Sequence, residues 1–360
     1  MPSQINLEDD EGPGEIYFVR EKDVISGHVS SYVKIGLVRA ADDRDSEDRL
    51  REHQTGNPRN LSLHGIVRTF SVSTAEGMMH RKLAVKRVSG EWFNLSDGEL
   101  GDAIAMCKTF AMSAEEHESR LIQVAALENT ESKAELIDAT EEALKWVKIL
   151  IEASAVISSC EKLAASFNAL TVSARDRGEE TIAIAKVQTR KGTEKFDEVG
   201  FKNEFPELHA QFEESKESIK KTFTLSNKKS YDLDLAQIHP ELFTLQQRFG
   251  ELKAKVVSEE QAVASLQGIY LNVLGILKEA SWDKEVAQTH LKIICGHAAG
   301  INDVCKWSRV RRVTVSINKK ALKSAYAAEY AKHVIVSATK EILVLKKGGG
   351  SAAGDDLEND

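Results

Sequence analysis

Acidic, histidine and basic side chains between residues 14 and 95 occur at spacings suited to binding a phosphate group or a metal ion. Glu76 and His80 are four residues apart in a segment expected to be helical, so they share one helix face. Arg81 and Arg87 give the same helix a basic edge. Further cations that could join this edge in a phosphate-binding groove are Lys34, Arg49, Arg51 and Arg59. A solvated helix face is the competing interpretation.

A small scaffold that could position these residues is predicted over residues 14–95. Runs rich in β-branched and aromatic residues predict strands at residues 16–19, 32–38 and 61–70. Helices are expected over residues 47–54, capped by Asp45 or Ser46, and over residues 75–86. Three strands and two helices in this length form a small α/β domain.

Six motifs follow one another along these elements. They are residues 14–19, 32–36, 48–50, 54–58, 79–80 and 90–93. In this order and spacing they resemble the GIY-YIG nuclease superfamily, in particular a phage-type branch described as a DNA-binding domain. The resemblance covers about a quarter of the chain. It implies cleavage of DNA phosphodiesters by an endonuclease or nickase with one divalent metal ion, Mg²⁺ or Mn²⁺.

The resemblance also implies a role for each site residue. Tyr17 would help to activate the attacking water, and Arg49 would hold the phosphate through its planar, permanently charged fork. Glu76 would bind the metal, with Glu91 as the alternative ligand or no metal-binding acid at all. His80 would assist in proton transfer or positioning, and a capping or core histidine is the other interpretation.

The second motif departs from the superfamily pattern, because Lys34 stands at the position of its tyrosine. A lysine could contact phosphate as a point charge, but it could not do the chemistry of a phenol. Tyr32, two residues earlier on the same strand face, is the alternative phenol. Gly36 is expected to allow a close backbone approach or a turn.

The rest of the chain is expected to be mainly α-helical, so that the whole protein is α+β. Residues 96–172 and 231–295 are predicted to form helices in antiparallel pairs. Apolar residues recur at spacings of three and four in the second stretch, from Leu242 to Ile276. This seam predicts either an ordinary bundle core or a coiled-coil contact that makes a homodimer.

A weak internal repeat links residues 182–212 with residues 303–333, at an offset of 121. Each copy is expected to be a basic strand followed by a short amphipathic helix, unless the similarity is due to chance. Arg311 and Arg312 lie in the second copy and could bind nucleic-acid backbone or an acidic tail. The expected units are residues 1–13, 14–95, 96–230, 231–347 and 348–360, the first and last being flexible acidic ends.

The net charge of −8 comes entirely from those two ends. Each end carries four acids and no base, which leaves 48 acids and 48 bases between them, so the net charge does not argue against a nucleic-acid partner. One acidic end could lie over a basic groove and compete with nucleic acid. The four cysteines form no C-x-x-C pair, and no apolar run approaches the length of a membrane span.

The sequence therefore predicts a cytoplasmic, metal-dependent DNA endonuclease that dimerises through its helical region, in a phage or bacterial defence context that only the resemblance implies. A non-catalytic nucleic-acid-binding or adaptor protein is the alternative, favoured by Lys34 and by Gly77, which stands where the metal-binding acid was expected. A structural coiled-coil protein is a third possibility.

Overall fold

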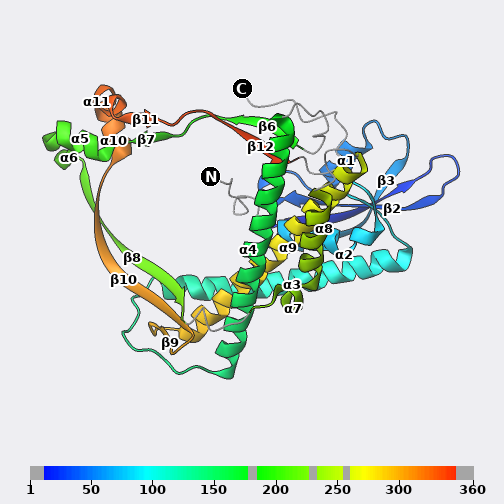
Figure 1. Cartoon of the computed structure of the whole chain (residues 1–360), viewed down its shortest axis with the longest axis horizontal. Coiled ribbons are helices and arrows are strands. Elements are labelled where there is room, and N and C mark those ends of the chain that lie inside the picture. Colours follow the sequence, from blue (N-terminus) through cyan, green and yellow to red (C-terminus); the bar gives the residue numbers. More distant parts are fainter. Residues whose placement is uncertain (1–11, 177–184, 227–232, 254–259, 346–360) are drawn as a thin grey trace.

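The computed structural model describes residues 12–176, 185–226, 233–253 and 260–345. It has a mixed α/β architecture, in which an N-terminal antiparallel sheet is followed by a mainly helical region (Figure 1). No helix in the described ranges combines the length and the apolar character needed to cross a membrane.

The N-terminal sheet has five strands, two more than predicted. They are β1 (Gly14–Lys22), β2 (Val29–Arg39), β3 (Asn60–Thr69), β4 (Arg87–Ser89) and β5 (Trp92–Asn94), in the order β3-β1-β2-β5-β4. The helices are α1 (Ser46–Gln54), which Asp45 caps as predicted, and α2 (Val72–Lys82). The helix predicted over residues 75–86 thus begins earlier and ends earlier. A separate 3-10 turn, Ala84–Lys86, then leads into β4.

The two faces of this sheet serve different purposes. Ile16, Phe18, Val33 and Ile35 point to the face that α2 and α3 cover, and they form a continuous apolar core. The alternation of strand side chains puts Tyr17 on the opposite face, which α1 covers. The first face therefore carries the packing that stabilises the sheet, and the second carries the polar residues described below.

Gly36 lies directly opposite Tyr17 in the antiparallel pair of β1 and β2. A Cβ atom at this position would overlap the ring and hydroxyl of Tyr17. The close approach expected at Gly36 is therefore confirmed, and the group that approaches is the tyrosine side chain.

Replacing Gly36 with alanine is expected to destabilise the protein by about 1–3 kcal/mol, because the Tyr17 ring cannot move without disturbing a packed face. Urea denaturation measures this loss as a lower midpoint. Gly101→Ala is the matched control, because a Cβ atom at this position of helix α3 meets no other atom. An unchanged midpoint for Gly36→Ala would contradict the role assigned to this glycine.

The helical region is built on long helices. They are α3 (Asp97–Glu128), α4 (Glu141–Asp176), α8 (Pro240–Lys253) and α9 (Glu260–Cys295), with the short helix α7 (Leu235–Ile238) before α8. Leu100, Ala103 and Cys107 of α3 belong to the core of the sheet, so the N-terminal unit continues past the expected boundary at residue 95.

The predicted apolar seam lies inside this chain. Its described members from α8 and α9, Leu242 to Ile276, pack with Val156, Leu163 and Phe167 of α4. They therefore form a bundle core within one molecule, and dimerisation remains a prediction. Val256 lies outside the described residues, and the side chain of Val263 is not described.

The repeat at an offset of 121 is visible in the structure. Helices α5 (Glu198–Glu204) and α6 (Pro206–Gln211) recur as α10 (Lys319–Ala325) and α11 (Ala327–Lys332), each 121 residues later. The caps recur too, because Asp197 accepts from the Gly200 amide as Asn318 does from the Ala321 amide. The N–H of each capping residue donates to a carbonyl of the other copy, that of His333 or Phe212.

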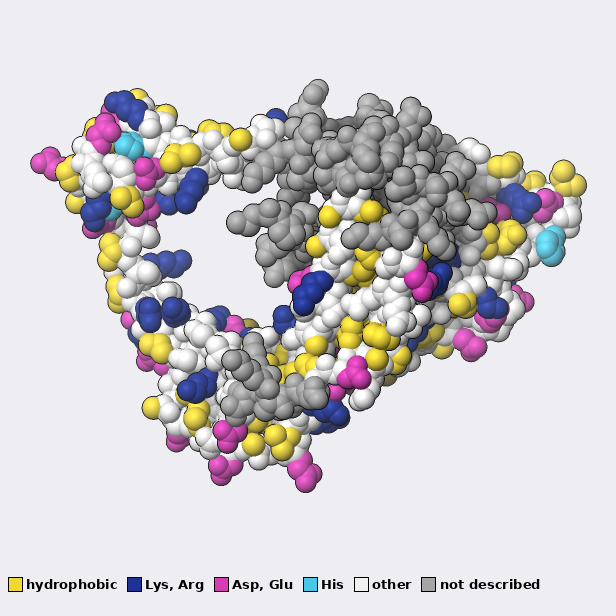
Figure 2. All heavy atoms as spheres, in the orientation of Figure 1, with side chains coloured by type: hydrophobic (Ala, Val, Ile, Leu, Met, Phe, Trp, Pro, Cys, Tyr) yellow, Lys and Arg dark blue, Asp and Glu magenta, His cyan; other side chains and the backbone are white. Residues whose placement is uncertain are grey.

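Each repeat is larger than predicted, because strands flank the helices on both sides and pair between the copies. The strands are β6 (Ala185–Arg190), β7 (Glu194–Phe196), β8 (Glu213–Leu225), β9 (Gly300–Ile301), β10 (Cys305–Ile317), β11 (Val334–Val336) and β12 (Lys340–Leu345). Strand β8 pairs with β10, β7 with β11, and β6 with β12. Two ribbons thus connect the long helices to the small helical cluster, and the molecule encloses an opening between them (Figures 1 and 2).

Candidate active site

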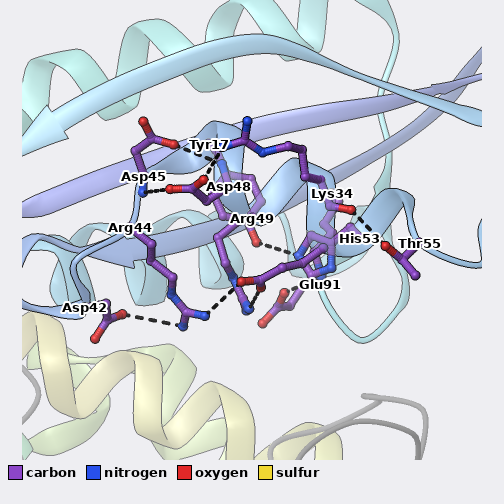
Figure 3. A network of polar contacts seen from close by, with 12 residues as sticks. Tyr17, Lys34, Asp42, Arg44, Asp45, Asp48, Arg49, His53, Thr55 and Glu91 are labelled. Carbon is purple, nitrogen blue, oxygen red and sulfur yellow. Dashed lines mark hydrogen bonds and ion pairs between the residues drawn. The ribbon is translucent and has the colours of Figure 1, made fainter.

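A cluster of ionisable residues lies on the α1 face of the N-terminal sheet (Figure 3). Tyr17 comes from β1, Lys34 from β2, Arg49 and His53 from α1, and Glu91 from the turn between β4 and β5. The sequence analysis named four of these residues as candidates, and the fold brings them together from segments up to 74 positions apart.

The side chains of α1 reach the sheet at Tyr17. The Tyr17 hydroxyl and His53 Nε2 are 3.1 Å apart, within hydrogen-bonding distance. The Arg49 guanidinium interacts with the same hydroxyl and also with Glu52. Arg49 and His53 are four residues apart, so they share one face of α1. A tyrosine, an arginine and a histidine therefore meet at one point.

Burial lowers the pKa of His53 to about 4, and the positive charges of Lys34 and Arg49 act in the same direction. The imidazole is therefore neutral at pH 7 and able to accept a proton. Burial also raises the pKa of Tyr17 well above its ordinary value, and the negative charge of Glu91 adds to this effect. Tyr17 therefore keeps its proton and can release it only by direct transfer to a hydrogen-bonded neighbour.

Lys34 and Glu91 form an ion pair of 2.8 Å beside this group. Burial would raise the pKa of Glu91, but the charge of Lys34 holds it below its ordinary value. Glu91 is therefore ionised at neutral pH. Lys34 accordingly contributes a positive charge to the site, as expected for a lysine at this position.

His80 and Glu76 lie on α2, and the charge of Glu91 in the cluster acts on His80. His80 Nε2 is 2.8 Å from the carbonyl oxygen of Ile35, and its ring packs against Phe93. Burial lowers the pKa of His80 to about 4. These contacts match the core histidine that the sequence left open. The negative charge of Glu76 raises the pKa of Tyr17.

Several predicted phosphate-binding residues lie outside the cluster. Arg81 pairs with Glu241 and Glu279 of the helical region, so it joins the two parts of the chain. Arg87 donates to the carbonyl oxygens of Gly90 and His80 and covers the ring of Phe93.

Two other candidates of the N-terminal domain lie near its surface. Arg51 points away from the cluster and pairs with Asp48, and its side chain is 74% exposed. Tyr32 is exposed on β2, beyond Lys34. Both were expected to contact the substrate, and neither contacts Tyr17 or His53 among the interactions of the described residues.

Arg311 and Arg312 lie far from this cluster, on strand β10. Arg311 pairs with Glu131 and Glu217, whereas Arg312 is exposed. The neighbouring Arg309 is buried, with its guanidinium 3.8 Å from the centre of the Trp307 ring. The basic cluster expected here is therefore divided between the interior and the surface.

A metal ion would have few protein ligands at this site. Within the described ranges, no group of three or more histidine, cysteine, aspartate or glutamate side chains is arranged to hold a metal. Glu91 and Glu76 both act on Tyr17 electrostatically, so each carboxylate is close to the cluster. Mg²⁺ can be held by one or two carboxylates together with water, and the site fits that arrangement.

His53 is the member of the cluster that sequence reasoning missed. The signal was present, because a histidine four residues after Arg49 must lie on the same helix face. The spacing of Glu76 and His80 in the helix predicted over residues 75–86 favoured His80 instead. The distance to Tyr17 depends on the packing of α1 against β1, which spacing alone could not give.

Comparison with known proteins corrects the family assignment. A protein-family model, the T5orf172 domain, matches residues 14–108. This family is distinct from the GIY-YIG superfamily, so the resemblance stated above is wrong, although the matched domain is a phage-type DNA-binding domain. Neither a curated protein nor a solved structure matches the chain. The match indicates a nucleic-acid partner and a nucleic-acid-binding or endonuclease-like function.

Proposed function

We propose that the N-terminal domain binds the phosphate backbone of DNA at Arg49 and Lys34 and hydrolyses a phosphodiester there, with Tyr17 and His53 transferring the proton of the attacking water. The observation that carries this proposal is a neutral histidine within hydrogen-bonding distance of a buried tyrosine hydroxyl, with the cations Lys34 and Arg49 beside it. The match to the T5orf172 domain supports a nucleic-acid substrate.

Arg49 and Lys34 bind the phosphate in this proposal. Both cations border Tyr17 and His53, and each now interacts with a carboxylate, Glu52 or Glu91. An incoming phosphate can share or replace those carboxylates. Charge on the phosphate oxygens then develops next to fixed positive groups, which is the main source of catalysis in phosphoryl transfer.

His53 accepts the proton that the attacking water loses. In the tautomer that leaves Nε2 unprotonated, Tyr17 donates its hydrogen bond to His53. Water can then give its proton to the Tyr17 oxygen while Tyr17 gives its own to His53. Tyr17 stays uncharged throughout, as its raised pKa requires. The departing oxygen takes a proton from solvent.

A divalent cation, Mg²⁺ or Mn²⁺, is part of the proposal. Glu91 or Glu76 would hold it, with water as the other ligands. The ion would supply additional positive charge at the phosphate oxygens. His80 and Arg87 support the site through the backbone of Ile35 and Gly90.

A cleavage assay of the full chain tests this function. Supercoiled, linear and single-stranded DNA are incubated with Mg²⁺, Mn²⁺ or EDTA, and nicked or linear products are separated on a gel. We expect products with either metal and none with EDTA. Tyr17→Phe should reduce the rate by about 100-fold or more, because the proton relay is broken. Equal rates for wild type and Tyr17→Phe would contradict the proposed site.

Binding without cleavage is the second candidate function. It is favoured by the ion pair that already occupies Glu91 and by the small number of potential metal ligands. It predicts no product under any metal condition, and an affinity for DNA that falls steeply with salt and survives Tyr17→Phe. The same assay, run beside a binding titration, distinguishes the two functions.

A further inference from the structure

The ribbon of β8 and β10 carries an unusual charge pattern that the N-terminal site does not explain. Its thirteen residue pairs run without a bulge from Cys305 opposite Leu225 to Ile317 opposite Glu213. Strand partners lie on one face and neighbours along a strand lie on opposite faces, so the register assigns each side chain to a face.

One face is anchored and electrically balanced. At its base, Trp307 and Cys305 are buried in the core between α4 and α9. Further out, Arg311 pairs with Glu131 and Glu217. Val313 and Val315 follow and are exposed. This face holds the ribbon on the helical region and has little charge left for a partner.

The other face is strongly positive. Its cations are Lys306, Lys220 opposite Val310, Arg312, and Lys216 opposite Thr314, and its one acid, Glu214, lies at the outer end. All four cations are exposed, and none forms an ion pair within the described part of the chain. Hydroxyl groups lie between them, on Ser218, Thr222, Thr224, Ser308, Thr314 and Ser316.

The row of cations has the length and chemistry of a backbone-binding surface. It covers eight residue steps, about 27 Å at the rise of an antiparallel strand. Duplex DNA carries about 16 negative charges over that length. Serine and threonine hydroxyls commonly donate to phosphate oxygens beside such cations.

Figure 2 shows how the cations of the ribbon lie relative to the rest of the molecule. Lys and Arg side chains of the ribbon gather along the opening that the two ribbons and the long helices enclose. A polyanion at the opening would therefore meet the ribbon from the inner side. Without an anionic partner, this row of cations destabilises the folded chain, because like charges repel each other.

We propose that this face of the β8–β10 ribbon is a second nucleic-acid site, which binds the backbone of duplex DNA at the opening. It is separate from the Tyr17 cluster and does not depend on cleavage there. Duplex is favoured over single strands because the face carries no aromatic side chain on which bases could stack. An acidic peptide is less well matched, because Val310 is the only apolar contact on this face.

The test is a salt titration of DNA binding by the full chain, in EDTA, with a fluorescent 30-base-pair duplex. The variant replaces Lys216, Lys220 and Arg312 together with glutamine. Because each lost phosphate contact reduces the slope of log K against log salt by about 0.9, we expect a slope smaller by about 2.7. Affinity near 0.15 M salt should fall roughly 100-fold. Thermal unfolding checks that the variant is folded.

Arg311→Gln is the matched control, because it lies on the same strand but its charge is already balanced on the other face. It should leave the slope unchanged, clearly short of the change of about 0.9 that one lost phosphate contact would give. The same salt titration is made with Arg49→Ala, so that the contribution of the Tyr17 site to DNA binding is measured separately from that of the ribbon. An unchanged slope for the triple variant would overturn the proposal. The proposal would also be overturned if the triple variant no longer bound a synthetic peptide of residues 348–360 but kept its DNA binding. The ribbon would then recognise the acidic tail.

Discussion

Arg49→Ala is expected to slow DNA cleavage by about 100- to 1,000-fold, the usual cost of removing one preorganised group that faces charge in the transition state. Arg49 interacts with the Tyr17 hydroxyl and lies on the same helix face as His53, so its loss removes a positive charge beside both groups. DNA affinity should fall by roughly 10-fold or more, because a hydrogen bond to a charged group contributes about 1.5–3 kcal/mol. Rates and affinities are measured on the same duplex.

Arg51→Ala provides the control for that experiment. Arg51 belongs to the same helix and has the same charge, but it pairs with Asp48 and is largely exposed. Its loss should change the cleavage rate by less than about 3-fold, because exposed ion pairs contribute little energy. Equal losses for the two variants would mean that α1 acts through its total charge, and the specific role of Arg49 would then be wrong.

His53→Gln should reduce cleavage by about 100- to 10,000-fold, the range for loss of a general base. Glutamine keeps a polar group near the Tyr17 hydroxyl and cannot accept a proton at neutral pH. DNA affinity should change little, because the imidazole is uncharged at pH 7. A variant that loses affinity and rate in the same proportion would show that His53 binds substrate and does not act as a base.

The pH dependence of cleavage by the wild-type protein gives an independent check on His53. An ordinary histidine gains a proton near pH 6.5, so a base of that kind would lose activity as the pH falls through 6. Burial lowers the pKa of His53 to about 4, so the neutral form should persist and kcat/KM should stay level from pH 7 to about pH 5. Activity should fall only as the pH approaches 4. A decline centred on pH 6.5 would contradict the buried, neutral state.

His80 shows what spacing alone could not decide about the surroundings of Tyr17. In the sequence, Glu76 and His80 formed an attractive pair on one helix face. In the fold, α2 packs on the apolar side of the sheet, and His80 Nε2 lies at the carbonyl oxygen of Ile35. Which face of a sheet a helix covers depends on its connections and on the whole apolar surface that it buries. A helix pattern by itself does not contain that information.

The repeat shows a related limit. Low sequence similarity was enough to find two copies at an offset of 121, because short helices with matching caps keep their local signals. The pairing of β8 with β10 could not be read from either copy, because it joins strands about 100 residues apart. Only that pairing places Arg311 beside Glu217 on one face of the ribbon and leaves Arg312, without an ion pair among the described residues, on the other face.

Local signals in the sequence by itself determined strands β1, β2 and β3 of the N-terminal sheet, the capped helix α1, the long helices and the duplicated segment. Hydrophobic period, capping residues and glycine positions act over a few residues, so they can be read directly. Tertiary structure alone decided that His53 reaches Tyr17, that Arg81 joins two parts of the chain, and that one face of a ribbon is left positive. Those outcomes depend on contacts between distant segments, which form only when burial of the apolar faces fixes how the elements pack.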